Sequence, residues 1–303
     1  MVVQRRNAAR EFLRLGDLDS ARAIADREME AAATRDGSAR DVWAYRLVLL
    51  EIERLRGHTE EALNKLHRLE QMDPPPQEDP ESWIGIIRIR GYYFGLLGRY
   101  EISCQLLQEA EAMARDLDLL ELRTEVQLCQ AMISYLQEKY SISSNIFHAV
   151  LALSNQIKGW YFNGVARWGI GKNLMIENHY QPAIPWLEDA VAIFEGVGSN
   201  SLAAVAFSEL AVCHLGLGND VLALDLLRKA ECVQHKAGSI GNYQVVLANI
   251  GNVYLYRGDH LTAISYYRQA LSLARQIKDP VSIRKWTYNI NLAYLRMRSA
   301  IDG

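Results

Sequence analysis

The sequence has little proline and few other residues that break helices. Seven prolines and twenty glycines occur among 303 residues, and residues 81–181 contain no proline at all. An all-β sandwich needs a turn signal roughly every 8 to 12 residues, so this breaker-free stretch argues against one and leaves room for successive helices. Half of the residues are apolar and 23% are charged, which is enough to bury a core and is not the composition of a disordered tail.

An excess of charge of one sign is also missing. The 33 basic residues are offset by 36 acidic ones, so the net charge of -3 gives no general attraction to nucleic acid. The most apolar stretch, around residues 84–97, is interrupted by Arg88 and Arg90, and the N-terminus lacks the apolar segment of a signal peptide. We therefore predict a cytoplasmic protein that binds neither nucleic acid nor a membrane.

Cysteine is scarce, and its spacing is not that of a disulfide framework. Cys104, Cys129, Cys213 and Cys232 lie far apart, each inside an apolar pattern with helical spacing. Such cysteines are typical of the reduced core of an intracellular protein. No paired C-x-x-C or H-x-x-x-H accompanies them, so we predict no metal site.

What the sequence does contain is an internal repeat. One series of turn positions recurs at intervals of 41, 41, 40, 40, 40 and 40 residues, and we call it the turn column: Gly16, Gly57, Gly98, Glu138, Asn178, Gly218 and Gly258. Five positions later runs a column of small residues: Ala21, Ala62, Ser103, Ser143, Ala183, Ala223 and Ala263. A further column lies seven positions before the turn: Ala9, Leu50, Gly91, Ala131, Gly171, Ala211 and Gly251. Aligned columns of this kind predict a repeat protein.

The clearest copy, residues 247–280, predicts a helical hairpin. Apolar residues with helical spacing lead to the turn at Gly258, and a second helical pattern follows it. Gly258 can take the left-handed conformation that ends a helix, and Asp259 can cap the next one. Small residues such as Gly251 and Ala263 let the two backbones approach, with Tyr267 filling the space between them. One hairpin cannot bury its apolar stripe alone, so neighbouring hairpins must stack.

These columns resemble those of the tetratricopeptide repeat (TPR) family, best at residues 249–254 and 263–270. The period exceeds the usual TPR length, so the chain resembles a subclass with longer, about 40-residue repeats. The added length ends at Gly37, Gly159, Gly198, Gly238 or Pro280. The resemblance implies an all-α, right-handed α-solenoid of seven hairpins plus a C-terminal helix.

We predict one domain, residues 1–303, in which the repeats span about 1–37, 38–78, 79–118, 119–158, 159–198, 199–238 and 239–279. A terminal helix over 281–300 follows, either as a solvating cap or as the point where a longer architecture was cut. Residues 43–47, 61–63 and 251–254 also resemble the TPR arrays that accompany CHAT (caspase-like) peptidase domains in bacteria. No match to the peptidase's own His and Cys motifs occurs, so an effector peptidase would act in cis from a removed portion or in trans.

Local motifs predict no catalytic, cofactor-binding or metal-binding residue. Gly169-Ile170-Gly171-Lys172-Asn173 lacks the G-x-x-x-x-G-K-[ST] pattern of a phosphate loop, and Gly171 already belongs to a packing column. The seven histidines are scattered singly, so a nucleophile paired with a histidine would arise only by an accident of folding.

The TPR resemblance implies that the first helix of each hairpin lines the concave face, and the repeat then specifies which side chains project there. The predicted protein- or peptide-binding residues are Arg6, Arg10, Arg54, Arg88, Tyr92, Tyr135, Trp168, Lys172, Asn252 and Tyr256. Arginine and aromatic anchors of this kind dominate the energetics of protein interfaces. Asn252 matches an asparagine that holds a C-terminal carboxylate in chaperone-binding TPR proteins, but its partner one unit earlier would be Val212, so that clamp is incomplete.

Two functions follow from this pattern. The first is a non-enzymatic scaffold that recognises a protein or peptide through its concave face. The second is a regulatory sensor that binds a ligand or peptide and controls an effector such as a CHAT-type peptidase. An enzyme in its own right ranks third, since the fold alone does not decide among the three.

Overall fold

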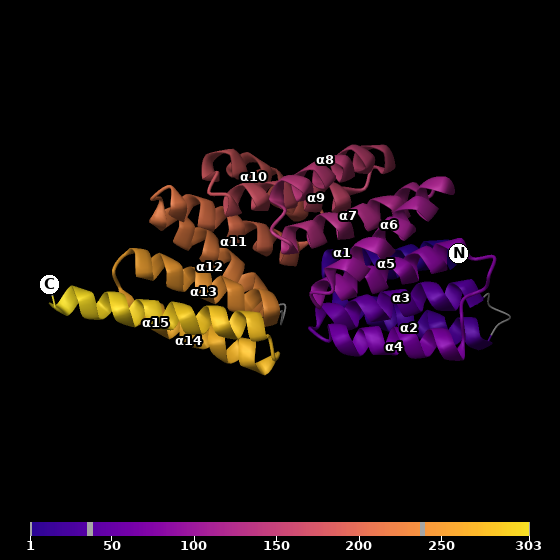
Figure 1. The fold of residues 1–303 in the computed structure, drawn as a ribbon, viewed down its shortest axis with the longest axis horizontal. Coiled ribbons are helices and arrows are strands. Elements are labelled where there is room, and N and C mark those ends of the chain that lie inside the picture. The colour runs from indigo at the N-terminus through magenta and orange to yellow at the C-terminus, as the bar shows by residue number, and fades with distance from the viewer. Residues whose placement is uncertain (1, 35–38, 237–239, 303) are drawn as a thin grey trace. The chain divides into compact units, whose positions relative to one another are not determined.

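The computed structural model describes residues 2–34, 39–236 and 240–302, with side chains given except for those of residues 2–7, 33, 34, 40 and 300–302. Within these residues the chain forms fifteen α-helices and no strand (Figure 1). The helices divide between two compact units, Met1–Asn173 (unit 1) and Leu174–Gly303 (unit 2). The single domain expected from the sequence stays a prediction.

Unit 1 contains four helical hairpins and most of the helix that opens the fifth. Its helices are α1 (Val2–Leu15), α2 (Leu18–Thr34), α3 (Ala39–Leu55), α4 (Thr59–Met72), α5 (Pro80–Leu96), α6 (Tyr100–Asp116), α7 (Leu120–Leu136), α8 (Tyr140–Ile157) and α9 (Trp160–Ile176), of which α9 ends inside unit 2. Unit 2 continues with α10 (Tyr180–Gly196), α11 (Asn200–Gly216), α12 (Asp220–Lys236), α13 (Ile240–Tyr256), α14 (His260–Gln276) and α15 (Pro280–Asp302).

The turn column is confirmed by the backbone. All seven of its residues have positive φ, from 61° at Glu138 to 93° at Gly57. In this conformation the residue after a helix closes the last turn, and glycine adopts it without strain. Asp259 caps the following helix as expected, because its side chain accepts a 3.1 Å hydrogen bond from the Thr262 amide.

The turns between hairpins differ in part from the expected positions. Gly198 has a φ of 77°, as predicted, but in the preceding turn the left-handed residue is Lys158 (φ 49°) and not Gly159. Gly37 and Gly238 lie outside the described residues. Asp118, Lys158, Gly198 and Lys278 occupy equivalent places along the repeat, so the second turn also follows its period.

The small-residue column packs the hairpins as predicted. Each of its seven side chains is between 0% and 1% exposed. In the seventh hairpin a Cβ added at Gly251 would lie 2.7 Å from Cε1 of Tyr267, which is closer than real side chains approach. Glycine at this position is therefore what allows the fully buried Tyr267 ring to fill the space between α13 and α14.

In unit 1 the apolar cores are shared between successive hairpins. One buried cluster joins hairpins one and two around Ala9 and Ile52, and another joins hairpins two and three around Trp43 and Tyr93. Buried polar atoms in the second cluster are satisfied, since the Tyr93 hydroxyl donates a 2.8 Å hydrogen bond to the carbonyl oxygen of Leu50. Sharing of cores is the packing expected of a stacked repeat array.

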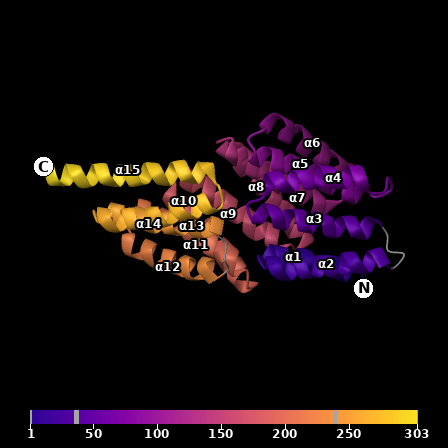
Figure 2. The same cartoon turned by 90° about the horizontal axis from the view of Figure 1, so that it is seen from below.

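In unit 2 a buried cluster joins α13, α14 and α15, and α15 lies alongside α14 (Figure 2). The terminal helix was predicted over 281–300 and extends over Pro280–Asp302. It is anchored by Trp286, which is 2% exposed and whose indole Nε1 donates a 3.1 Å hydrogen bond to Gln244 Oε1 on α13.

Two of the four cysteines are wrongly predicted as core residues. Cys129 and Cys213 are buried, whereas Cys104 and Cys232 are exposed, and all four are free thiols. Cys104 follows the buried Ser103 in α6, and one residue of a helix turns the side chain by about 100° away from it. Among the described helices, none is sufficiently long and apolar to cross a lipid bilayer.

Candidate functional site

The first helices of the hairpins form one wall in unit 1, which we call the inner wall. Contacts run from α1 to α3, from α3 to α5 and from α5 to α7. The described part of α9 within unit 1 joins them, since Lys172 lies over the ring of Tyr135 on α7. This is the wall on which the repeat placed the predicted binding residues of hairpins one to five.

A row of alternating charges crosses the inner wall. It consists of Arg14, Glu51, Arg88 and Glu125, each 37 positions after the one before. We call this set the charged row. The repeat is close to 41 residues long here, so a step of 37 residues reaches the next hairpin at a position about four residues, or one helical turn, earlier. The four side chains therefore form a diagonal across α1, α3, α5 and α7.

Ion pairs link the members of the charged row from α3 to α7 and back to α1. Arg88 Nη1 lies 3.2 Å from Glu51 Oε1, and Arg88 Nε lies 3.4 Å from Glu125 Oε2. Arg14 Nη2 donates hydrogen bonds to Glu125 at 3.2 Å and to Glu121 at 2.7 Å. Arg54 closes the other end, with its Nε 2.7 Å from Glu51 Oε2.

These ion pairs hold their carboxylates in the charged form. Burial by itself raises the pKa of Glu51, but Arg54 and Arg88 outweigh it and the pKa lies below its ordinary value. Burial opposes ionisation of Glu125 in the same way, and the nearby arginines again bring its pKa below the ordinary value. Removing one partner of such a buried pair leaves a charge unpaired, which is strongly destabilising.

Burial keeps two side chains next to the charged row, Tyr92 and Cys129, in their protonated forms. Burial raises the pKa of the Tyr92 hydroxyl to about 12, and burial raises the pKa of the Cys129 thiol to about 11. Since the thiolate is the nucleophilic form, Cys129 is a weak nucleophile at neutral pH. Among the described residues, no group of three His, Cys, Asp or Glu side chains is placed to hold a metal ion.

The first helix also contacts the start of α9. Trp160 Nε1 donates a 2.8 Å hydrogen bond to Glu11 Oε1, across 149 positions of sequence. The Arg14 guanidinium carbon lies 5.5 Å from the centroid of Tyr161 and 5.0 Å from that of Phe162, in cation–π geometry. Arg14 therefore connects α1 to both α7 and α9.

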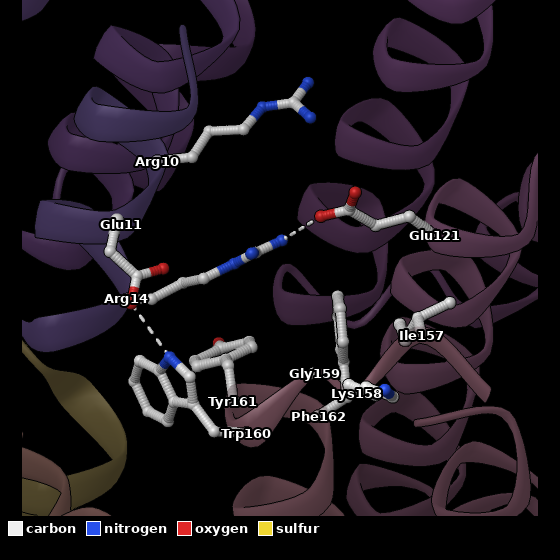
Figure 3. A pocket seen from close by; sticks show the side chains of 10 residues that line it. All are labelled: Arg10, Glu11, Arg14, Glu121, Ile157, Lys158, Gly159, Trp160, Tyr161 and Phe162. Carbon is white, nitrogen blue, oxygen red and sulfur yellow. Dashed lines mark hydrogen bonds and ion pairs between the residues drawn. The ribbon is translucent and has the colours of Figure 1, made fainter. Parts of the chain in front are cut away.

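A cavity of about 330 Å³ opens where these elements meet, and we call it the α1–α9 pocket (Figure 3). Its lining combines cations, carboxylates and aromatic rings: Arg10, Glu11, Arg14, Glu121, Ile157, Lys158, Gly159, Trp160, Tyr161 and Phe162. In Figure 3 the dashed contacts run from Arg14 to Glu121 and from Trp160 to Glu11, while the guanidinium of Arg10 stands apart from both.

A second feature of the inner wall is a lysine between two aromatic rings. Lys172 Nζ lies 4.7 Å from the centroid of Trp168 and 5.1 Å from that of Tyr135. The three side chains are partly exposed. We call them the Lys172 cluster. Gly169, one residue after Trp168, allows the ring of Phe147 to approach α9, so this glycine serves helix packing.

The structure brings most of the predicted binding residues of unit 1 onto the inner wall. Arg10 lines the α1–α9 pocket, Tyr135, Trp168 and Lys172 form the Lys172 cluster, and Arg54 lies 5.2 Å from the ring centroid of Tyr92. Arg54 and Arg88 are engaged in ion pairs, with side chains only 20% and 13% exposed. The side chain of Arg6 lies outside the described residues.

Two predicted binding residues belong to unit 2. Asn252 Oδ1 accepts a 2.8 Å hydrogen bond from the Tyr267 hydroxyl, so this asparagine takes part in packing between α13 and α14. Tyr256 is 58% exposed. Their role in binding stays a prediction.

Sequence reasoning missed several residues of the pocket and of the ion pairs, namely Glu11, Glu121, Glu125, Lys158, Trp160, Tyr161 and Phe162. The charged row carried a signal that could have found Glu125, because charges of opposite sign recur with a fixed step of 37 residues. The approach of α1 to α9 has no comparable signal in the sequence.

Comparison with known proteins supports the repeat. Residues 246–277 match the family model described as a tetratricopeptide repeat. None of the curated proteins compared matches the chain. Among solved structures, a Rap protein complexed with competence and sporulation factor is 14% identical, with a TM-score of 0.73, and the match covers 98% of this chain and 86% of that one.

Two further solved structures are similar over nearly the whole chain. The apo form of the quorum sensor NprR from B. thuringiensis is 15% identical with a TM-score of 0.63, covering 98% of this chain and 81% of that one. A STAND protein (signal transduction ATPase with numerous domains) with a tetratricopeptide repeat sensor, from Pyrococcus horikoshii, is 15% identical with a TM-score of 0.65, covering 99% of this chain and 48% of that one. At such identities the likeness concerns the fold. The seventh hairpin thus matches a tetratricopeptide repeat, and the chain has the all-helical fold of TPR solenoid proteins.

Proposed function

We propose that this chain is a non-enzymatic scaffold that binds a protein or peptide segment on the inner wall of unit 1. The observation that carries the proposal is the α1–α9 pocket, which opens where the wall presents arginine and aromatic side chains. Pockets of about 300 Å³ and more are the usual size for a bound group, and arginine and aromatic anchors supply most interface energy. The Lys172 cluster supplies a second anchor of the same composition.

A sensor is the alternative, and one observation favours it. Glu11 and Arg14 line the pocket and at the same time hold α1 to α7 and α9. A bound segment that competes for Glu11 and Arg14 would weaken the contacts of α1 with α7 and α9. Binding in the pocket would therefore shift the first hairpin toward a less firmly attached state. The proposed effector is a CHAT-type peptidase in cis or in trans. The similar structures include a Rap protein complexed with a factor, a quorum sensor and a TPR sensor, which agrees with a binding or sensing role.

The test uses two charge reversals on the wall and one away from it. A partner is recovered from lysate, identified and purified, and its affinity for the purified chain is measured by calorimetry. Arg10→Glu alters the pocket and Lys172→Glu alters the Lys172 cluster, while Lys139→Glu changes an exposed side chain with no capping hydrogen bond at the start of α8.

We expect Arg10→Glu, Lys172→Glu or both to weaken binding by at least about tenfold, and Lys139→Glu to leave it unchanged. Binding that both wall variants retain in full would overturn the proposal. So would turnover of a substrate by the purified chain that a single cysteine or histidine substitution abolishes.

A further inference from the structure

The charges that line the α1–α9 pocket are unequally engaged. Both carboxylates already accept hydrogen bonds, Glu11 from Trp160 and Glu121 from Arg14. Arg14 is shared between Glu121 and Glu125. The side chains of Arg10 and Lys158, in contrast, donate no hydrogen bond to any residue that the structure describes. Arg10 still lies close enough to Glu125 to help lower the pKa of that carboxyl.

These two cations, whose side chains donate no hydrogen bond to a described residue, favour an anionic ligand group. A guanidinium offers parallel N–H donors that match the two oxygens of a carboxylate or two oxygens of a phosphate. Arg10 is partly buried beside the pocket, so folding has already removed part of the water around its side chain. Binding of a ligand therefore has less water to displace from it. An ammonium such as that of Lys158 adds a mobile point charge that can follow the anion.

The size of the pocket limits what can enter. A cavity of about 330 Å³ is at the small end for ligand sites and accepts one side chain or one chain end. Ile157 and the ring of Phe162 line the pocket together with the charged groups. A short aliphatic stem that carries an anionic group would therefore find apolar contact as well as the cations.

The carboxylates of the pocket favour a weakly charged anion. Glu11 and Glu121 place two negative charges on the lining. Their repulsion of an anion offsets much of the attraction that the cations exert, while the cost of removing an anion from water grows faster than its charge, so a phosphate dianion is opposed more strongly than a carboxylate monoanion. Of the two anions that fit a guanidinium, the carboxylate is the better match here.

We infer that the α1–α9 pocket binds a carboxylate of the partner segment, with Arg10 as the principal donor and Lys158 as the second cation. This inference rests on the proposed function, since it names the chemical group that the inner wall recognises. The carboxylate belongs either to an aspartate or glutamate side chain or to the end of the partner chain.

The test uses small probes that separate these sources. N-acetyl-glutamate α-amide carries only the side-chain carboxylate, and N-acetyl-leucine carries only the terminal one. N-acetyl-glutamine amide is the neutral control, and N-acetyl-phosphoserine amide supplies a phosphate. Binding is followed by NMR through the indole N–H of Trp160, assigned with Trp160→Phe, in a buffer free of carboxylate and phosphate.

The expected result is a saturable shift with at least one carboxylate probe, and none with the neutral probe. Arg10→Gln and Lys158→Gln should each weaken that binding, Arg10→Gln by about tenfold, while Lys139→Gln leaves it unchanged. Circular dichroism and thermal melting establish that each variant is folded.

Several results would overturn the inference. They are equal binding of the neutral probe, tighter binding of the phosphate probe, unchanged binding by Arg10→Gln, or no saturable shift with any probe. The proposed function is judged separately, by the purified partner. If that partner depends on Lys172 while the carboxylate probes do not bind, the inference fails and the proposed function stands.

Discussion

Arg14 and Glu121 lie 107 positions apart in the sequence, and Arg14 Nη2 donates a 2.7 Å hydrogen bond to Glu121 Oε1. The same guanidinium is 3.2 Å from Glu125 and stacks over Tyr161 and Phe162. A single side chain of the first hairpin thereby stabilises contacts with the fourth and fifth. Through this side chain α1 contacts both α7 and α9.

Replacing Arg14 with methionine should loosen the first hairpin. The variant keeps an aliphatic stem but leaves Glu125 with fewer partners in a buried setting, at a cost of about 2 kcal/mol in the free energy of unfolding. Urea denaturation measures the loss, and hydrogen exchange should quicken in α1 more than in α13. Arg115→Met is the matched control, because Arg115 is 53% exposed and pairs with Glu111 within one helix. Equal losses in the two variants would contradict the role given to Arg14.

The charged row makes stability depend on pH in the acid range. The pKa values of Glu51 and Glu125 in the folded chain lie below the ordinary value of 4.5. The unfolded chain therefore takes up protons at higher pH than the folded chain does. The stabilisation is complete above about pH 5 and is lost as the pH falls below about 4.5 toward the folded pKa values.

Glu125→Gln separates the contribution of Glu125 to the pH dependence of stability from the contributions of other acidic residues. The variant should be less stable than the parent at pH 7, because it replaces a charge that Arg14 and Arg88 pair with. Below about pH 4.5 the unfolded parent takes up a proton at Glu125 more readily than the folded parent does, so the parent loses stability and the difference between the two proteins should shrink. Urea denaturation at pH 7, 5, 4 and 3 measures the trend, and a difference that is constant with pH would contradict it.

The sequence predicts the hairpins well because their determinants are local. The turn column, the small-residue column and the cap at Asp259 each act within one repeat or between neighbours, so their spacing alone reveals them. The contacts of the charged row connect one hairpin to the next, so they are less local than the turns and caps. Its step of 37 residues also relates the exposed pairs Arg56–Asp19 and Arg257–Asp220, so it reflects the geometry of stacked hairpins.

The α1–α9 pocket could not be predicted in this way. It depends on the approach of α1 to α7 and α9, which arises from small rotations that accumulate over several hairpins. The spacing of residues within a repeat does not specify those rotations. For the same reason the ion pairs of Arg88 with Glu51 and Glu125 were not predicted, and the binding role predicted for Arg88 stays a prediction.

Close packing of α13 on α14 gives a prediction for unit 2. Gly251→Ala would place a Cβ 2.7 Å from the buried ring of Tyr267, and relief of that clash should cost about 1–3 kcal/mol in the free energy of unfolding. Gly241→Ala, in the same helix, meets no atom within 4 Å and should be neutral or slightly stabilising through helix propensity. Thermal and urea denaturation compare the two, and a Gly251→Ala variant as stable as Gly241→Ala would show that the ring can move aside.

The attachment of α15 depends on Trp286. Its ring is 2% exposed, its Nε1 donates to Gln244 Oε1 at 3.1 Å, and Gln244 Nε2 in turn donates to Asp279 Oδ2 at 3.3 Å. Trp286→Ala removes the ring from the core and leaves the buried Gln244 oxygen without its donor, so we expect a loss of about 3–5 kcal/mol and release of the helix. Tyr288→Ala is the matched control, because Tyr288 lies two residues away on the same helix and is 66% exposed. Limited proteolysis should cut α15 of Trp286→Ala well before that of Tyr288→Ala. Equal rates of cleavage in the two variants would mean that contacts other than those of Trp286 hold the helix in place.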